Sequence, residues 1–253
     1  MGDMRILERL SEAPRLLLGR PRRLLAGLLA TAALATALTA CTAAQGDGLT
    51  MAPVPMEATA PAADVVVIGD SLSTGLMTSP ADAWPTLIQN KLSSSTPAKS
   101  APRSLYNAAE NGAGYIAQGS AGDTFGDEVR RAVTNGSKEV LFFGSDNDLG
   151  DNPDDIARAA ASALAQAHAQ APKATLIVVG PPSYSETPDS ALTAIRDALQ
   201  SASKQEGARF VDPITEDWIA PQAAQLLADD GEHPSVAGHQ LLASKMETLL
   251  GIA

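Results

Sequence analysis

The fold is decided at Asp64-Val65-Val66-Val67-Ile68-Gly69-Asp70-Ser71-Leu72-Ser73. The first half of this stretch is a β-branched run that ends at a glycine, which is typical of a strand buried on both faces of a parallel sheet. The second half consists of small and polar residues, which are typical of a tight turn. The stretch therefore predicts a strand followed by a turn that exposes the hydroxyl of Ser71 at the N-terminus of a helix.

From residue 64 onward, short apolar runs alternate with helical patterns. Further strands are expected at 105–107, 139–143, 175–179 and 209–211. Helices are expected at 81–92, 123–134, 154–170, 189–206 and 235–249. Strands that alternate with helices predict a parallel sheet with helices on both faces. We therefore expect an α/β fold, with three α/β/α layers and a five-stranded parallel sheet.

The composition excludes several classes of protein. A chain of 253 residues with 45% hydrophobic residues is expected to form one globular domain with an appendage. The formal net charge of −11 argues against binding to nucleic acid, which requires a basic face for the phosphates. The single cysteine, Cys41, excludes a disulfide framework and a cysteine-rich metal cluster.

Residues 1–40 have the pattern of an export signal. Six arginines precede the uncharged run 24–40, which is short for a membrane span of about 20 residues. The run ends at Leu38-Thr39-Ala40-Cys41, which resembles the lipobox of bacterial lipoproteins. This resemblance implies a signal peptide at 1–40 and a lipid anchor on Cys41 at the extracytoplasmic face of the bacterial cell membrane, or secretion. An uncleaved anchor helix is the alternative, and the choice between Sec and twin-arginine export stays open.

The segment 41–63 is expected to join this signal to a domain at 64–253. Its residues after Cys41 are mostly Ala, Pro, Gly, Thr and Met without periodicity, which is typical of a flexible tether. Residues 1–40 hold six arginines and three acidic residues, so their removal would change the net charge to −14. Such a surface is not attracted to anionic lipid, and membrane attachment would depend on the lipid anchor.

Polar residues gather after the predicted strands. The carboxyl ends of parallel strands meet at one edge of a sheet, so these segments are expected to converge there. They are 69–73, 111–114, 144–148, 180–183 and 229–234. A serine nucleophile needs a base, and the base needs an orienting carboxylate. Ser71, His233 and Asp230 are candidates for these three roles.

The same segments offer donors for an oxyanion hole. The backbone N–H of Gly112 is not shielded by a side chain, and the side-chain amide of Asn147 is a second donor. Together with the N–H of Ser71, these groups would stabilise negative charge on a reacting carbonyl oxygen.

Four blocks in this order resemble the SGNH or GDSL hydrolases, a family named for Ser, Gly, Asn and His. The blocks are Gly69-Asp70-Ser71-Leu72-Ser73, Asn107-Ala108-Ala109-Glu110-Asn111-Gly112, Gly144-Ser145-Asp146-Asn147-Asp148 and Asp230-Gly231-Glu232-His233-Pro234. The resemblance extends from residue 64 to the C-terminus. It implies the flavodoxin-like fold of this family and hydrolysis of an ester without a metal or cofactor.

The resemblance also implies a role for each matched residue. Ser71 would be the nucleophile, His233 the base and Asp230 its partner, with Ser71, Gly112 and Asn147 as the oxyanion donors.

Two alternatives stay open at the oxyanion donors. The third block has one residue more than the usual spacing, so Asp146 competes with Asn147; we favour Asn147, because a carboxylate would oppose a developing oxyanion. In the second block Gly114 competes with Gly112, which we favour for its spacing from Asn107.

The expected substrate is a small-molecule carboxylic ester with a short acyl group, because no long apolar insertion resembles a lid. O-Deacetylation of envelope or extracellular glycans is an alternative, although an aromatic content of 4% offers few stacking platforms. A lipoprotein that binds a ligand without catalysis is a second alternative. We expect a monomer.

The remaining polar patterns are expected to be structural. His168 lies in an alanine-rich helical pattern and should be solvated, whereas His239 should be a structural residue of the last helix. The acidic run 146–155 fails the calcium-loop template, and the acidic residues of 229–233 lack a distant ligand. No metal site is therefore expected.

Overall fold

The computed structural model describes residues 60–94 and 103–252. The predicted signal at 1–40, Cys41 and most of the tether lie outside these residues. No helix in the described part of the chain combines the length and the apolar character needed to cross a bilayer.

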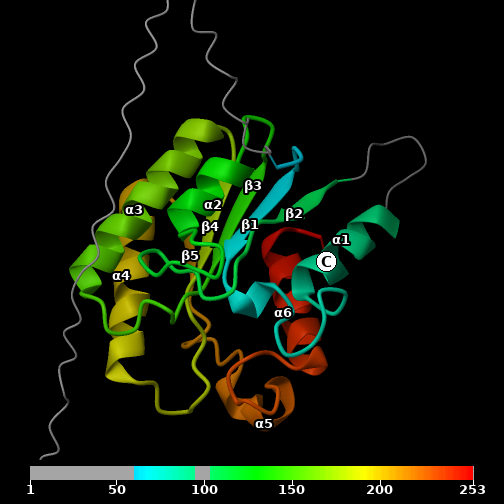
Figure 1. The fold of residues 1–253 in the computed structure, drawn as a ribbon, viewed down its shortest axis with the longest axis vertical. Helices are drawn as coiled ribbons and strands as arrows, with labels where there is room; N and C mark the ends of the chain where they lie inside the picture. The colour runs from blue at the N-terminus through cyan, green and yellow to red at the C-terminus, as the bar shows by residue number, and fades with distance from the viewer. Residues whose placement is uncertain (1–59, 95–102, 253) are drawn as a thin grey trace, which may run out of the picture. The chain divides into compact units, whose positions relative to one another are not determined.

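A five-stranded parallel sheet forms the centre of the fold, as predicted (Figure 1). The strand order is β2-β1-β3-β4-β5, so β1 lies inside the sheet between β2 and β3. The strands are β1 (Val65–Gly69), β2 (Leu105–Asn107), β3 (Glu139–Phe143), β4 (Thr175–Val179) and β5 (Arg209–Val211).

The buried β-branched run of β1 contributes to both faces of the sheet. Val66 and Ile68 belong to one hydrophobic core, and Val65 and Val67 belong to the other. Successive side chains of a strand point to opposite faces, so each face receives alternate residues. This double burial explains why the run is apolar at every position.

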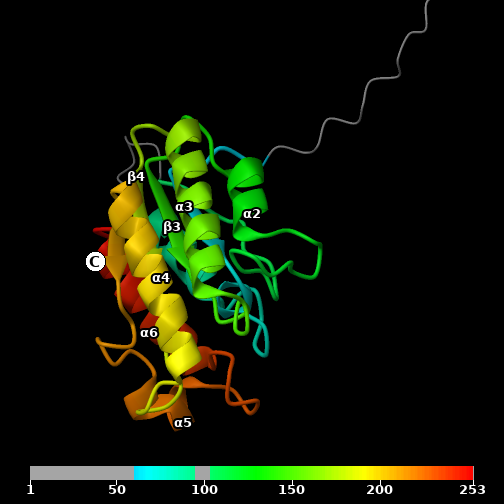
Figure 2. The same ribbon diagram turned by 90° about the vertical axis from the view of Figure 1, so that its left-hand side faces the viewer.

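Two layers of helices cover the sheet (Figure 2). The first face packs against α2 (Phe125–Ala132), α3 (Pro153–Gln170) and α4 (Ser190–Glu206). The second face packs against α1 (Trp84–Ser94) and α6 (Val236–Leu249). The three-layer α/β/α architecture is thereby confirmed.

Short elements connect the sheet to these layers. They are the 3₁₀ helix η1 (Ser71–Ser73), the 3₁₀ helix η2 (Ala220–Gln222) and the single-turn helix α5 (Ala223–Leu226). The helix predicted at 123–134 ends earlier, because the backbone of Val133 is extended. Ser235 caps α6 as expected, and its Oγ accepts a hydrogen bond from the N–H of Gly238.

His239 joins α6 to α1 on the second face of the sheet. Its ring is completely buried, and its Nδ1 accepts a hydrogen bond of 3.4 Å from the N–H of Trp84. Burial disfavours the imidazolium and lowers the pKa of His239 to about 4, although the nearby Asp82 opposes this shift. The structural role predicted for His239 is confirmed, and His168 is exposed as expected.

The burial of His239 predicts a pH dependence of stability. Below its unfolded pKa of 6.5, the unfolded chain binds a proton that the folded chain does not bind. Protonation of His239 in the unfolded chain therefore opposes folding as the pH drops from 6.5 towards 4, and His239→Gln lacks this contribution. Between pH 7 and pH 5 the free energy of unfolding should change less favourably in the wild type than in His239→Gln, because the two proteins share all other titrating groups. Urea unfolding of both proteins at the two pH values measures the difference. Equal changes in the two proteins would contradict the assignment.

Candidate active site

Ser71 lies at the turn that follows β1. It is the first residue of η1 and is 8% exposed. The completely buried Asp70 caps this turn, because its Oδ1 accepts a hydrogen bond of 2.9 Å from the N–H of Leu72. Gly69 permits the close approach of the turn, since a Cβ there would lie 3.0 Å from Ser73 Oγ and 3.2 Å from the Phe143 carbonyl oxygen.

His233 and Asp230 form a hydrogen-bonded pair before α6. The distance between His233 Nδ1 and Asp230 Oδ2 is 2.7 Å, and Asp230 Oδ1 also accepts the backbone N–H groups of Glu232 and His233, each at 3.1 Å. The hydrogen bond with His233 is the largest effect that lowers the pKa of Asp230, to about 2. Because Nδ1 is engaged by Asp230, Nε2 is the ring nitrogen left to exchange a proton with another group.

The second block keeps one backbone donor available. Gly112 has a φ of +81°, and its N–H donates to no other group in the described part of the chain. By contrast, the N–H of Gly114 donates to the carbonyl oxygen of Ala117 at 2.9 Å. A Cβ on Gly114 would also lie 2.4 Å from Asp148 Oδ1. Gly114 therefore serves the close packing of this loop, and Gly112 retains a free donor.

The third block is tied to the second through Asn147. Its Nδ2 donates to the carbonyl oxygen of Ala113 at 2.8 Å, which leaves the second hydrogen of the amide. Its backbone N–H donates to Ser145 Oγ at 2.9 Å, and that hydroxyl donates to the same carbonyl oxygen of Ala113 at 3.0 Å. The amide of Asn147 is thereby held in one orientation.

Asp146 lies close to the fourth block. Its Oδ2 accepts a hydrogen bond of 3.3 Å from the hydroxyl of Tyr184. Burial is the main cause that raises the pKa of Asp146, the charge of Glu232 raises it further, and His233 opposes the shift. The competitor of Asn147 is thus already bound to Tyr184, beside the histidine loop.

Asp148 is a site residue that sequence reasoning missed. It is completely buried, and its carboxylate accepts the backbone N–H groups of Tyr115, Ile116 and Ala117 at 2.8, 3.0 and 2.8 Å. It therefore anchors the loop that follows Gly112 to the loop that carries Asn147. The signal in the sequence was an acidic residue directly after the candidate asparagine, which looked like part of a solvated acidic run.

Hydrogen bonds join the first three blocks to one another. The N–H of Glu110 donates to the carbonyl oxygen of Gly69 at 3.1 Å, and Thr74 Oγ1 donates to Asn111 Oδ1 at 2.5 Å. The fourth block is coupled to the third through the charges of Asp146, Glu232 and His233. Within the described structure Ser71 and His233 make no hydrogen bond to each other; such catalytic contacts commonly tighten when substrate binds.

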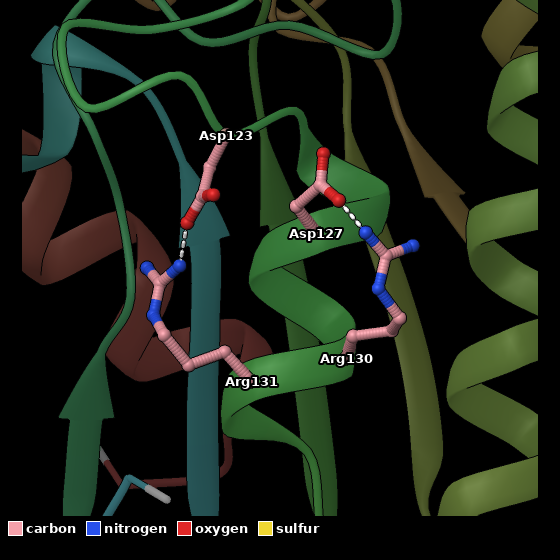
Figure 3. A pocket seen from close by; sticks show the side chains of 4 residues that line it. All are labelled: Asp123, Asp127, Arg130 and Arg131. Atoms are coloured by element: carbon pink, nitrogen blue, oxygen red, sulfur yellow. Dashed lines mark hydrogen bonds and ion pairs between the residues drawn. The ribbon is translucent and has the colours of Figure 1, made fainter. Parts of the chain in front are cut away.

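A separate polar pocket of about 260 Å³ lies at α2 (Figure 3). Asp123, Asp127, Arg130 and Arg131 line it, and Figure 3 shows the ion pairs Arg131–Asp123 and Arg130–Asp127. None of the predicted site residues lines this pocket. Its two aspartates and two arginines carry equal and opposite charges. Across residues 60–94 and 103–252, no group of three or more His, Cys, Asp or Glu side chains is arranged to hold a metal ion.

Solved structures with a similar fold include several esterases. The psychrotrophic esterase EstA from Pseudoalteromonas sp. has a TM-score of 0.54 at 18% identity, over 73% of this chain and 94% of that protein. TesA has a TM-score of 0.56 at 19% identity, over 75% of this chain and 99% of TesA. A family two carbohydrate esterase from Clostridium thermocellum, solved with cellohexaose, has a TM-score of 0.55 at 16% identity, over 80% of this chain and 67% of that protein. These similarities support the three-layer fold.

Sequence comparison assigns the family. A GDSL lipase of Mycobacterium tuberculosis, Rv0518, is 38% identical over 148 residues, which cover 57% of this chain and 64% of that relative. The match thus spans less than two thirds of the relative. The model of the GDSL-like lipase/acylhydrolase family matches residues 67–241, a range that contains all four blocks. This chain belongs to the GDSL-like lipase/acylhydrolase family.

Proposed function

We propose that this chain is a serine esterase that cleaves carboxylic esters with Ser71, His233 and Asp230. The observation that carries the proposal is the 2.7 Å hydrogen bond between His233 Nδ1 and Asp230 Oδ2, in a family chain whose serine follows the buried strand β1. This pairing fixes the imidazole in the tautomer that a general base requires. The lowered pKa keeps Asp230 ionised at neutral pH.

The reaction begins when Ser71 Oγ attacks the ester carbonyl carbon and His233 Nε2 takes the hydroxyl proton. Asp230 stabilises the imidazolium that forms. The tetrahedral intermediate collapses when the bond to the leaving alkoxide breaks, and the alkoxide takes the proton from His233. Water then attacks the acyl-enzyme, with His233 again as base, and the carboxylic acid leaves as Ser71 regains its proton.

Three donors would stabilise the oxyanion during both halves of the reaction. They are the N–H groups of Ser71 and Gly112 and the free amide hydrogen of Asn147. The bonds from Asn147 and Ser145 to the carbonyl oxygen of Ala113 hold the Asn147 amide next to the Gly112 loop before the substrate arrives. Donors that are already oriented stabilise developing charge without the cost of reorganisation.

The distribution of exposed apolar side chains supports an ester with an apolar acyl group. Among residues 60–94 and 103–252, the exposed large hydrophobic residues are Leu76, Met77, Leu149 and Val236. Each lies within six positions of Ser71, Asn147 or His233. Exposed apolar side chains so near the site residues in the sequence would suit a short acyl chain. Carbohydrate deacetylation remains the second candidate, because one enzyme of similar fold is a carbohydrate esterase.

We also propose that the protein is exported and anchored by a lipid on Cys41. The order of arginines, apolar run and Leu38-Thr39-Ala40-Cys41 supports this proposal. The segment 42–63 would then serve as the tether between membrane and enzyme.

The role of Ser71 is tested by Ser71→Ala. The variant should lose at least about a thousandfold in kcat/KM for p-nitrophenyl acetate, because the nucleophile is gone and only the oxyanion hole and binding remain. Steady-state kinetics measure the loss, and an unchanged thermal midpoint is the control for folding. Activity close to the wild-type value would rule out Ser71 as nucleophile, and an inactive wild type would favour a ligand-binding role.

The acyl preference is tested with p-nitrophenyl esters from acetate to dodecanoate, together with acetylated oligosaccharides. We expect kcat/KM to peak at short acyl chains. Leu149→Ser should lower kcat/KM for butyrate by about tenfold or less, because the side chain is 50% exposed and should contribute only about 1 kcal/mol, and it should affect acetate less. The exposed Asn90 on α1 provides the control substitution, Asn90→Ser. Faster cleavage of acetylated sugars than of any aryl ester would support the glycan candidate.

The anchor is tested by Cys41→Ala in the full chain. Wild-type protein should incorporate a fatty-acid label and sediment with membranes, whereas the variant should carry no label. Equal labelling of the two proteins would contradict lipidation at Cys41.

A further inference from the structure

Glu128 is a buried acidic residue that the proposed reaction does not use. It belongs to α2 and is completely buried. Its Oε2 accepts a hydrogen bond of 2.9 Å from the N–H of Gly69, two residues before Ser71. Its Oε1 has no hydrogen-bond partner in the described part of the chain. An acidic side chain of α2 is therefore connected to the backbone that leads into the nucleophile turn.

Gly69 needs this acceptor because β2 is too short to supply one. The N–H of Val65 donates to the carbonyl oxygen of Ser104, and the carbonyl oxygen of Val67 accepts the N–H of Ala108. Every second residue of β1 therefore directs its backbone N–H and C=O towards β2. The pairing of the two strands stops at Val67 and Asn107. The next acceptor along that edge, the carbonyl oxygen of Ala108, receives Arg131 Nη2 at 3.1 Å instead. Glu128 replaces the missing sheet partner of Gly69.

Hydrogen bonds hold both backbone polar groups of Gly69. Its carbonyl oxygen accepts the N–H of Glu110 at 3.1 Å, while its N–H is held by Glu128. Both polar groups of the residue are thus bound on the side where β2 has ended. A buried backbone group that loses its hydrogen-bond partner destabilises the fold, so this arrangement is preferred over arrangements that leave either group unpaired.

We propose that Glu128 is a positioning residue for the nucleophile, which holds the backbone at Gly69 and thereby orients Ser71. The inference rests on the proposed function, because it assigns Glu128 a part in the reactivity of Ser71. The hydrogen bond of Glu128 goes to the backbone of the turn and not to Ser71 or His233, so we assign it no proton transfer in the reaction itself.

The surroundings of Glu128 favour a neutral carboxyl group. Burial is the main cause that raises its pKa to about 9; the hydrogen bond from Gly69 opposes this shift, and the charges of Asp70 and Glu110 add to it. Asp70, in the same turn, has its pKa raised to about 8 by burial and by the charge of Asp146. What Glu128 supplies is therefore an oxygen acceptor rather than a negative charge, and a glutamine at this position retains that acceptor.

The experiment compares Glu128→Gln with Glu128→Leu in the full chain. Glutamine retains the acceptor without a charge, whereas leucine has a similar size and no acceptor. We measure kcat and KM for p-nitrophenyl acetate, the rate of Ser71 labelling by a fluorophosphonate, and the thermal midpoint. Leu164→Ala, a substitution in the buried face of α3, is the control for lost stability.

The expected result separates positioning from stability. Glu128→Gln should retain kcat and the labelling rate within about threefold. Glu128→Leu should lose about ten- to a hundredfold in both, with KM little changed, since small displacements of a reacting group have effects of this size. Leu164→Ala should keep the wild-type rates despite a lower thermal midpoint. Equal losses in Glu128→Gln and Glu128→Leu, or wild-type rates in Glu128→Leu, would overturn the proposal.

Hydrogen exchange of the Gly69 amide distinguishes failure of this inference from failure of the proposed function. The amide should be protected in the wild type and in Glu128→Gln, and should exchange faster in Glu128→Leu. Unchanged protection in Glu128→Leu would overturn the inference even if the enzyme is active. A wild type that neither hydrolyses esters nor is labelled would refute the proposed function, and the positioning role with it, whatever the exchange data show.

Discussion

The two hydrogen bonds of Gly69 at the end of β1 fix the point from which the site is built. The strand before this residue is buried on both faces and cannot move without disrupting two hydrophobic cores. The turn after it carries Ser71 and is capped by a buried aspartate. Between them, the backbone of Gly69 is held by Glu110 on one polar group and by Glu128 on the other. The orientation of Ser71, the proposed nucleophile, is thereby connected to the packing of the sheet.

The loops that carry the proposed oxyanion donors depend on a second set of buried contacts. Asp148 accepts three N–H groups of the loop that follows Gly112, and the carbonyl oxygen of Ala113 accepts hydrogen bonds from both Ser145 and Asn147. These bonds connect loops that are more than thirty residues apart in the chain. Donors held in this way can stabilise an oxyanion without rearrangement, which is the main electrostatic contribution expected of such a site.

The sequence predicted the sheet and the main helices because their periodicity is strong. The β-branched run of β1 and the alanine-rich pattern of α3 are long and regular. The segment between β5 and α6 contains η2 and α5, which are too short to give a periodic signal. Those short elements were therefore not predicted.

Buried acidic residues were the other features that the sequence analysis missed. Charged residues are almost never fully buried unless paired, so the sequence analysis did not single out Asp148 or Glu128 as buried. The pattern of α2 nevertheless held a signal: its buried residues Phe125, Glu128, Val129 and Ala132 occupy consecutive core positions of one helix face. A glutamate at a core position of an amphipathic helix indicates a buried hydrogen-bond partner, but only the structure identifies that partner as Gly69.

The most direct test of this account is a crystal structure of the protein after reaction with an alkyl fluorophosphonate. The account predicts a phosphorus–oxygen bond to Ser71 Oγ, with the phosphonyl oxygen about 2.7–3.1 Å from the N–H nitrogens of Ser71 and Gly112 and from Asn147 Nδ2. It also predicts His233 Nε2 within hydrogen-bond distance of Ser71 Oγ. An adduct on another residue, or a phosphonyl oxygen bound by other donors, would contradict the central claim.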